Sequence, residues 1–313
     1  MGTIVGAHLA RAGHSVAMIV RERRARQIES DGLRVRGLIE FSTPVATITN
    51  PSHLRHADVL IVTPKALDTA AALEPLRCAE IGAALSVQNG VMKNEILAAA
   101  FPQAHVLGAL ANFSGELLAS GEVLFTRNNN LMLGDLEAPL SARARKLAAV
   151  IDAAGVRSVA VPNIRSQEWS KFAAWVGLVA VSVTTRSVTW KYLIDPGTAL
   201  VIVRMLREVG ALATASGVEL TDEAMFPAAT MCRVSEAEGV EIIRAQGAQF
   251  RDKSPEHRLS TLQDLDARRP MELDETFGYA VERASQLEVG LPLTEAFYSV
   301  AKVIDRLARE TPA

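Results

Sequence analysis

Lys171 is the residue whose surroundings best suit it to acid–base chemistry. It lies in the stretch QEWSKFAAWVGLVAVSV, and an apolar stripe at helical spacing follows it: Phe172, Trp175, Val176 and Val179. Burial lowers the pKa of a lysine, so Lys171 could donate a proton near neutral pH. Alternatively, its long side chain reaches water from the mouth of the helix. Glu272, in RRPMELDE, could pair with it, although a glutamate near a helix start also interacts with the helix dipole.

Two polar residues follow two predicted strands. Residues 58–63 (DVLIVT) read as a buried strand before Pro64-Lys65, and residues 83–87 (AALSV) as another before Gln88-Asn89-Gly90. Ligands of open α/β sheets bind beyond the carboxyl ends of the strands. Each residue alone has a simple alternative, a surface lysine and an Asn-Gly turn. Lys65 and Asn89 together, at neighbouring strand ends, favour a ligand site.

The first residues, MGTIVGAHLARAGHSV, predict a helix followed by a strand. A dinucleotide-binding unit has a strand, the sequence G-x-G-x-x-G and a helix, and the third glycine lets helix and strand pack closely. Gly2 takes the place of that third glycine. The pattern then lacks a first strand and two glycines, about 10 residues given ordinary strand lengths. A start assigned at an internal methionine would explain this, and the intact mass of the natural protein would test it; otherwise the helix simply begins with glycine.

The end of the next strand predicts which dinucleotide binds. The strand SVAMIV is followed by RERR, which begins at Arg21. An acidic residue at this place usually binds the ribose hydroxyl of NAD, whereas arginine accommodates the 2′-phosphate of NADP. The planar guanidinium suits a phosphate, so Arg21 favours NADP. The alternative is the solvated start of a helix.

The first half of the chain alternates short apolar runs with helices, which predicts a parallel sheet covered on both faces. The predicted helices are residues 3–12, 21–31 and 143–154. The predicted strands are residues 15–20, 58–63, 83–87, 106–110, 122–126, 130–134 and 156–161, with 122–126 and 130–134 as a polar hairpin.

The second half is predicted to be helical, with no recurring strand pattern. Its helices are residues 167–184, 196–216, 221–247, 272–287 and 292–309. We therefore predict an α/β Rossmann-type parallel sheet whose first strand is absent, in residues 1–162, followed by an all-α domain in residues 163–313. The apolar helices could pack on one another or on a second copy of the chain, as a homodimer through the helical domain.

Composition excludes several classes of protein. The 313 residues exceed the size at which single cores stop growing, about 250–300 residues, so two domains are expected. A net charge of −2 gives no support for nucleic-acid binding. The longest apolar run, FAAWVGLVAVSV, is shorter than the roughly 20 residues of a membrane span. No membrane partner is therefore expected. Cys78 and Cys232 have no metal-binding spacing, so no metal site is expected, and two cysteines without a disulfide framework indicate a reducing cytoplasm.

The chain resembles the ketopantoate reductase family (2-dehydropantoate 2-reductases) over almost its whole length. The matching stretches are GTIVGAHLARAGHSV, VTPKALD, VQNGV, NIRSQEWSKF, LSTLQDLDARRPMELD and GLPLTEAFYSVAK. The most specific feature is the LQD…R.P.E.D string with a lysine helix upstream of it. The resemblance implies a Rossmann domain followed by an all-helical domain. It also implies reduction of 2-dehydropantoate to pantoate by NADPH, a step of pantothenate biosynthesis.

The resemblance also assigns roles to residues of this sequence. Lys171 would protonate the carbonyl oxygen of a small 2-oxo acid as the hydride reaches carbon, and Glu272 would orient Lys171 and meet the substrate hydroxyl. Ser260 would bind the substrate carboxylate. Lys65 and Asn89 would line the cleft beside nicotinamide and substrate. The expected cofactor contacts are those of Gly2, Arg21, Lys65, Asn89 and Glu272.

Three positions depart from the family pattern. The family helix usually reads K-x-x-x-N-x-x-x-N, and Trp175 and Val179 stand here in place of the two asparagines. His257 replaces a further asparagine, three residues before Ser260. Because the family asparagines hold polar groups of pantoate, these changes affect the substrate pocket more than the proton donor. We include Trp175 and His257 among the expected substrate contacts.

The departures leave alternatives to ketopantoate reduction. One is the same chemistry on another 2-oxo acid, with a less polar tail beside Trp175. Another is a dinucleotide-binding protein without catalysis. Lys171, Glu272 and Ser260 argue against the second alternative, since binding alone does not need that set.

Overall fold

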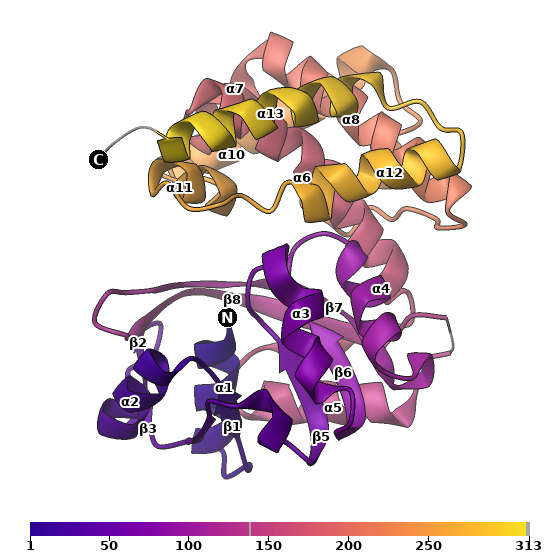
Figure 1. Cartoon of the computed structure of the whole chain (residues 1–313). Coiled ribbons are helices and arrows are strands. Elements are labelled where there is room, and N and C mark those ends of the chain that lie inside the picture. The colour runs from indigo at the N-terminus through magenta and orange to yellow at the C-terminus, as the bar shows by residue number, and fades with distance from the viewer. Residues whose placement is uncertain (138, 311–313) are drawn as a thin grey trace. The chain divides into compact units, whose positions relative to one another are not determined.

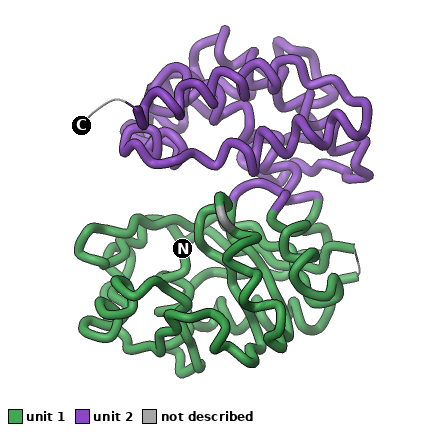
Figure 2. The backbone as a smooth tube through the Cα atoms, viewed as in Figure 1, with its two compact units in different colours: residues 1–88, 93–165 green, residues 89–92, 166–313 purple. Residues whose placement is uncertain are grey.

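The computed structural model describes residues 1–137 and 139–310. The chain divides into two compact units (Figure 2). The first unit comprises Met1–Gln88 and Lys93–Arg165, and the second comprises Asn89–Met92 and Ser166–Ala313. The segment Asn89–Met92 thus groups with the helical unit, although the sequence analysis assigned it to the first domain.

The first unit is built on a parallel-rich sheet (Figure 1). Its larger sheet has the strand order β3-β2-β8-β7-β6-β5, with β9 paired to β8, while β1 and β4 form a separate parallel pair. All pairs are parallel except β2–β3 and β7–β8. The strands are β1 (Ala17–Ile19), β2 (Leu33–Gly37), β3 (Phe41–Thr43), β4 (Ala46–Ile48), β5 (His56–Val62), β6 (Glu80–Ser86), β7 (Val106–Leu117), β8 (Val123–Asp135) and β9 (Ser158–Ala160).

Three helices of the first unit lie within one residue of the predicted ranges 3–12, 21–31 and 143–154, whereas the helices of residues 69–73 and 92–100 were not predicted. Gly32 ends α2 with a φ of +71°, a conformation that glycine adopts without strain. The Ser141 side chain accepts a hydrogen bond from the Ala144 N–H at 3.1 Å and caps α5. These helices are α1 (Gly2–Arg11), α2 (Glu22–Asp31), α3 (Thr69–Leu73), α4 (Met92–Ala100) and α5 (Ala142–Ala153).

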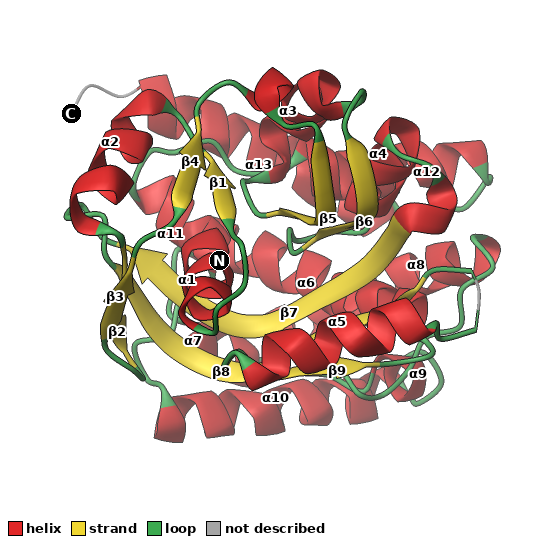
Figure 3. Ribbon diagram, turned by 90° about the horizontal axis from the view of Figure 1, so that it is seen from below, coloured by secondary structure: helices red, strands yellow, loops and turns green. Residues whose placement is uncertain are grey.

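The predicted hairpin of residues 122–126 and 130–134 is wrong, because both runs belong to the single strand β8. The long antiparallel partner of β8 is β7 (Figure 3). The asparagines of this region are satisfied within the fold. Asn128 donates to the Gly155 carbonyl at 3.1 Å and accepts from the Arg157 N–H at 3.0 Å, and Asn112 donates to Asn130 at 2.9 Å. Tertiary contacts therefore outweigh the low strand propensity of asparagine.

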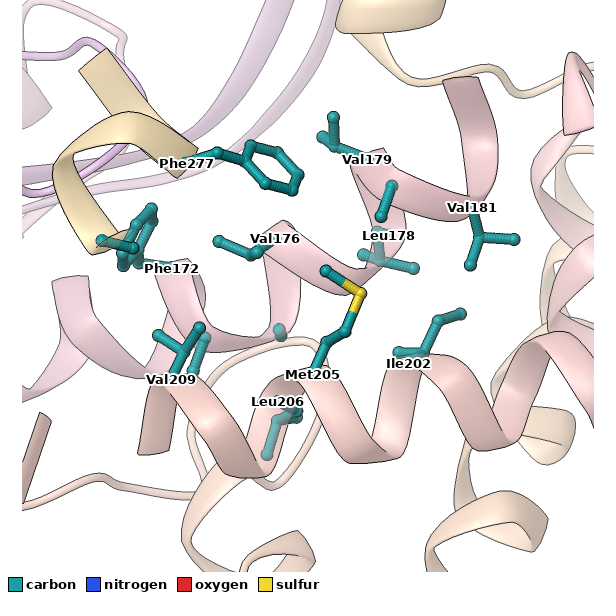
Figure 4. Packing of buried hydrophobic residues seen from close by; sticks show 14 of the residues in the cluster. Phe172, Val176, Leu178, Val179, Val181, Ile202, Met205, Leu206, Val209 and Phe277 are labelled. Carbon is teal, nitrogen blue, oxygen red and sulfur yellow. The ribbon is translucent and has the colours of Figure 1, made fainter. Parts of the chain in front are cut away.

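The second unit is helical, as predicted. Its longest helix, α6, is buried along most of its length, and aliphatic side chains pack between it and α8 (Figure 4). A π-helical turn at Asp274–Gly278 leads directly into α12. The helices are α6 (Ile164–Thr185), α7 (Thr189–Ile194), α8 (Pro196–Ala215), α9 (Ala228–Met231), α10 (Glu236–Lys253), α11 (Ser260–Asp266), α12 (Tyr279–Gln286) and α13 (Pro292–Glu310).

The predicted helix of residues 221–247 is wrong over its first half. The short helix α9 and a turn precede α10, which begins only after Ser235. Ser235 and Glu238 form a capping box, in which each side chain bonds to the other residue's backbone N–H. Asp222 holds the preceding loop by accepting hydrogen bonds from the Thr230 N–H at 2.8 Å and hydroxyl at 2.6 Å. A local capping signal therefore outweighs the apolar spacing.

Candidate active site

Lys171 lies at one end of a mostly apolar face of α6. Trp175 and Val179 follow it at one-turn intervals, so the three side chains share one side of the helix, which we call the lysine face. Lys171 and Trp175 are half-buried, whereas Val179 is fully buried. The amine of Lys171 is therefore followed along the helix by an indole and then by the hydrophobic core.

The segment after Glu272 packs on the lysine face. Phe277 is fully buried, and its ring lies 6.5 Å from the Trp175 ring, centroid to centroid, at a tilt of 56°. Figure 4 shows the Phe277 ring pointing toward the helix that carries Val179. Glu272 itself is half-buried, and the Thr276 hydroxyl donates to its backbone carbonyl. Two segments about a hundred residues apart in the sequence are thus joined through an aromatic pair.

The Asn89-Gly90 turn contacts the same segment. Gly90 has a φ of +79°, and a Cβ there would lie 3.2 Å from the Thr276 Cγ2 and 3.4 Å from the Glu275 carbonyl oxygen. Val91, the next residue, is buried in the core of the second unit. The turn therefore lies directly against residues 275–276. The fold of the second unit brings together the segments that carry Asn89, Lys171 and Glu272.

A buried glutamine links the strand ends that precede Lys65 and Asn89. The Gln88 side-chain amide donates to the Pro64 carbonyl at 2.8 Å and to the Thr69 hydroxyl at 2.7 Å. Its oxygen accepts from the Ser86 hydroxyl at 2.8 Å. Sequence analysis did not single out Gln88, although an amide directly after a buried strand was a signal that could have found it.

Lys93 fixes the backbone of the same turn. Its side chain is buried, and its amine donates to the carbonyls of Gln88 at 3.1 Å and Ala109 at 2.5 Å. The segment that follows β6 is thereby tied to β7. Lys65, by contrast, is exposed, at the start of the turn after β5.

Gly2 and Arg21 lie in the first unit. A Cβ at Gly2 would overlap the side chain of Thr63, just beyond β5, so only glycine allows this approach of α1. Arg21 is the residue before α2, and its exposed side chain makes no hydrogen bond or ion pair with any described residue. Arg24 is different, because it donates to the Gly121 carbonyl at 2.8 Å and burial lowers its pKa. Of these two arginines, Arg21 remains available for a ligand.

Ser260 and His257 lie in one loop of the second unit. Ser260 is the first residue of α11 and is exposed, whereas His257 is half-buried. The Thr189 backbone N–H donates to the His257 carbonyl at 2.8 Å, which ties this loop to the start of α7.

Two acids of the LQD…R.P.E.D string have structural roles. Asp264 is paired with Arg269 at 3.2 Å. Asp274 accepts hydrogen bonds from Lys302 at 2.7 and 2.8 Å and from Tyr298. Burial raises the pKa of Asp274, but the bonds from Lys302 and Tyr298 outweigh it and lower that pKa overall. Part of the string thus serves the packing of the helical unit.

Comparison with known families decides the identity of the fold. Residues 1–138 match the model described as ketopantoate reductase PanE/ApbA, and residues 163–305 match its C-terminal counterpart. The chain belongs to the ketopantoate reductase family. It is therefore an oxidoreductase of that family.

Relatives of the ketopantoate reductase family agree with this assignment. The chain is 32% identical over 171 residues to a 2-dehydropantoate 2-reductase of Archaeoglobus fulgidus, and this match covers 55% of the chain and 56% of that protein. A ketopantoate reductase structure from Ralstonia eutropha is 26% identical with a TM-score of 0.81, covering 98% of this chain and 95% of that one. D-mandelate dehydrogenase with NADH and anilino(oxo)acetate shares the fold at 18% identity and a TM-score of 0.81, covering 98% and 96%.

The three departures from the ketopantoate reductase pattern have different structural outcomes. Val179 has no exposed surface and belongs to the hydrophobic core. Trp175 is partly exposed beside Lys171, and His257 is partly exposed in the loop before Ser260. Of the three, Trp175 and His257 therefore keep surface with which to meet a ligand.

Two further kinds of site were sought in this member of the ketopantoate reductase family: a membrane-spanning helix and a metal-binding cluster. Among residues 1–137 and 139–310, no helix is long and apolar enough to cross a membrane. In the same ranges, no group of three His, Cys, Asp or Glu side chains could hold a metal ion.

Proposed function

We propose that this protein reduces a 2-oxo acid with NADPH, and that 2-dehydropantoate is the substrate to test first. The observation that carries the proposal is the grouping of three segments in one unit. The Asn89 turn contacts residues 275–276, and Phe277 of the Glu272 segment contacts Trp175 on the lysine face. Family membership supplies the reaction class.

The proposed reaction divides the work among these residues. When bound, NADPH supplies the hydride that adds to the carbonyl carbon. Lys171 donates a proton from its ammonium to the carbonyl oxygen, which yields a 2-hydroxy acid and a neutral amine that water reprotonates. Glu272 orients Lys171 and accepts a hydrogen bond from the new hydroxyl. Ser260 donates to the substrate carboxylate, and Asn89 positions the carbonyl group.

The first unit has features that suit a phosphate-bearing dinucleotide. The first turn of α1 contains no acidic residue, and the amino end of a helix attracts anions. Gly2 permits the close approach of the start of α1 to Thr63. Arg21 and Lys65 are exposed cations, and Arg21 favours the 2′-phosphate of NADP over the bare ribose of NAD.

A cytoplasmic location stays a prediction.

Trp175 favours a second candidate substrate. An indole beside Lys171 offers apolar area where the family pattern has an asparagine, so a 2-oxo acid with an aromatic or branched tail would bury more surface there. The ternary structure of D-mandelate dehydrogenase, which shares the fold, contains NADH and anilino(oxo)acetate. Phenylglyoxylate therefore belongs beside ketopantoate among the substrates tested.

The deciding experiment follows NADPH oxidation by the wild-type protein and by Lys171→Ala. Turnover of ketopantoate should fall about 10²–10⁴-fold in the variant, while NADPH affinity is retained. Turnover in the wild type should also fall as pH rises and Lys171 loses its proton. Tight NADPH binding without turnover of any 2-oxo acid would instead indicate a dinucleotide-binding protein without catalysis.

A further inference from the structure

Thr189 makes two hydrogen bonds to His257. Its backbone N–H donates to the His257 carbonyl at 2.8 Å, and its hydroxyl oxygen lies 2.8 Å from His257 Nδ1. Thr189 is almost fully buried as the first residue of α7. The Phe250 ring packs against the imidazole with centroids 4.9 Å apart. The ring is therefore held by contacts on its Nδ1 side and on its face.

A buried tyrosine sets the direction of the hydrogen bonds. The Tyr192 hydroxyl donates to the Thr189 hydroxyl at 3.2 Å. Burial raises the pKa of Tyr192 to about 12, so the phenol keeps its proton at neutral pH. Because the Thr189 oxygen accepts from Tyr192, its own proton needs another acceptor.

His257 Nδ1 is that acceptor. Among the described residues, the Thr189 hydroxyl has two hydrogen-bonding neighbours, Tyr192 and His257. If His257 Nδ1 carried a proton, the buried Thr189 hydroxyl would lose its acceptor, and a buried donor without a partner is unfavourable. The chain Tyr192–Thr189–His257 therefore places the ring proton of a neutral imidazole on Nε2.

We propose that Thr189 is a positioning residue that holds His257 as its Nε2–H tautomer, a fixed hydrogen-bond donor three residues before Ser260. The family pattern has an asparagine here, whose amide both donates and accepts. A neutral Nε2–H only donates, so in the proposed function His257 would offer the substrate a donor where the asparagine offers both a donor and an acceptor. This consequence for substrates rests on the proposed function, whereas the tautomer does not.

The tautomer can be measured without turnover. Nitrogen NMR of protein labelled at histidine with ¹⁵N, at about pH 8 where free histidine is neutral, separates the two ring nitrogens. The protein has six histidines, and the ring-nitrogen signals that disappear in the His257→Gln variant are those of His257. We expect Nε2–H in the wild type and in Thr189→Ser, which keeps the hydroxyl. Thr189→Val, which has the shape of threonine without the hydroxyl, should show Nδ1–H or a mixture.

Kinetics supply the second readout. With ketopantoate, Thr189→Val should raise KM about tenfold and leave kcat within about twofold, because Lys171 is untouched, and Thr189→Ser should restore KM. An Nδ1–H tautomer in the wild type, or an unchanged tautomer in Thr189→Val, would overturn the positioning role. Lack of turnover in the wild type would count against the proposed function alone, since the NMR result decides the tautomer independently. If Thr189→Val does not fold, Thr189→Ala replaces it in the same comparison.

Discussion

At position 175 a single side chain sets the polarity of the surface beside Lys171. The indole packs on Phe277 and keeps part of its surface exposed. An asparagine there would offer a donor and an acceptor instead of apolar area. Under the proposed function, we therefore expect the choice between ketopantoate and a less polar 2-oxo acid to depend on Trp175 more than on Val179, which is buried.

We expect Trp175→Asn to shift substrate preference toward ketopantoate. Its kcat/KM for ketopantoate relative to phenylglyoxylate should rise about tenfold, which corresponds to one good polar contact of about 1.4 kcal/mol. Loss of the aromatic pair with Phe277 should lower the free energy of unfolding by about 1 kcal/mol. Trp175→Phe is the matched control, because it keeps the apolar surface. Equal preferences in the two variants would show that residue 175 does not face the substrate.

His8 is a buried titratable residue of the first unit. Its Nδ1 lies 2.8 Å from the Ile4 carbonyl, and its ring packs edge-on against Phe41 and Phe125. Burial lowers the pKa of His8 from its ordinary value of 6.5, and nearby Arg11 lowers it further against the opposing bond to Ile4. The folded protein therefore binds a proton at His8 less readily than the unfolded chain.

This difference predicts a loss of stability in acid. As pH falls below about 6.5, the unfolded chain takes up the proton first, so the free energy of unfolding decreases until pH passes the folded pKa. Urea unfolding between about pH 7 and pH 5 should show a smaller slope in His8→Leu than in the wild type. The exposed His14, changed to leucine, should leave the slope unchanged. A slope that His8→Leu does not alter would assign the acid sensitivity to other groups.

At the scale of elements, β5 and β6 pair up to Val62 and Ser86, and a side chain links the segments just beyond them. Gln88 supplies three side-chain hydrogen bonds there, to Pro64, Thr69 and Ser86. The backbone at Pro64, just before Lys65, is therefore held by Gln88, the residue just before Asn89.

We expect Gln88→Leu to loosen both strand ends. It leaves buried donors and acceptors without partners, so the free energy of unfolding should drop by about 2–4 kcal/mol. NADPH affinity and ketopantoate KM should both worsen, since the backbone before Lys65 is no longer held by the Gln88 amide. Gln88→Glu keeps the size and the acceptor oxygen, so its free energy of unfolding should lie between those of the wild type and Gln88→Leu. Unchanged cofactor affinity in Gln88→Leu, measured by fluorescence titration, would mean that the link serves stability only.

At the scale of the whole molecule, the chain passes between the two units more than once. The segment Asn89–Met92 leaves the first unit, contributes Val91 to the core of the second and returns through α4. One stretch of backbone thus carries Asn89 on a turn that is anchored in the helical core.

Shortening this anchor should destabilise the helical unit selectively. Val91→Ala should lower its free energy of unfolding by about 1–2 kcal/mol through the lost burial and the cavity. Hydrogen exchange should speed up for amides of α6 and α12 and stay unchanged for those of β7. Val123→Ala, in the core of the first unit, is the control: it should speed up exchange in β7 and leave α6 and α12 unchanged. Equal changes in both units would indicate that they unfold as one.

Local pattern was sufficient for much of the architecture. The run of residues 172–183 is apolar on all sides, so burial as a helix was its stable outcome, and α6 confirms this prediction. Alternating apolar runs and helices predicted the parallel-rich sheet, and the string around Glu272 indicated the family. These features rest on burial and spacing over neighbouring residues, which the sequence alone determines.

Only the tertiary structure decided which distant side chains meet. Asn128 lay between the two predicted strands of a hairpin, yet bonds to Gly155 and Arg157 keep it in β8. The pairing of Trp175 with Phe277 and of Thr189 with His257 joins residues about 70 to 100 positions apart. No local pattern predicts such pairs, because each contact forms only when whole helices have packed and excluded water.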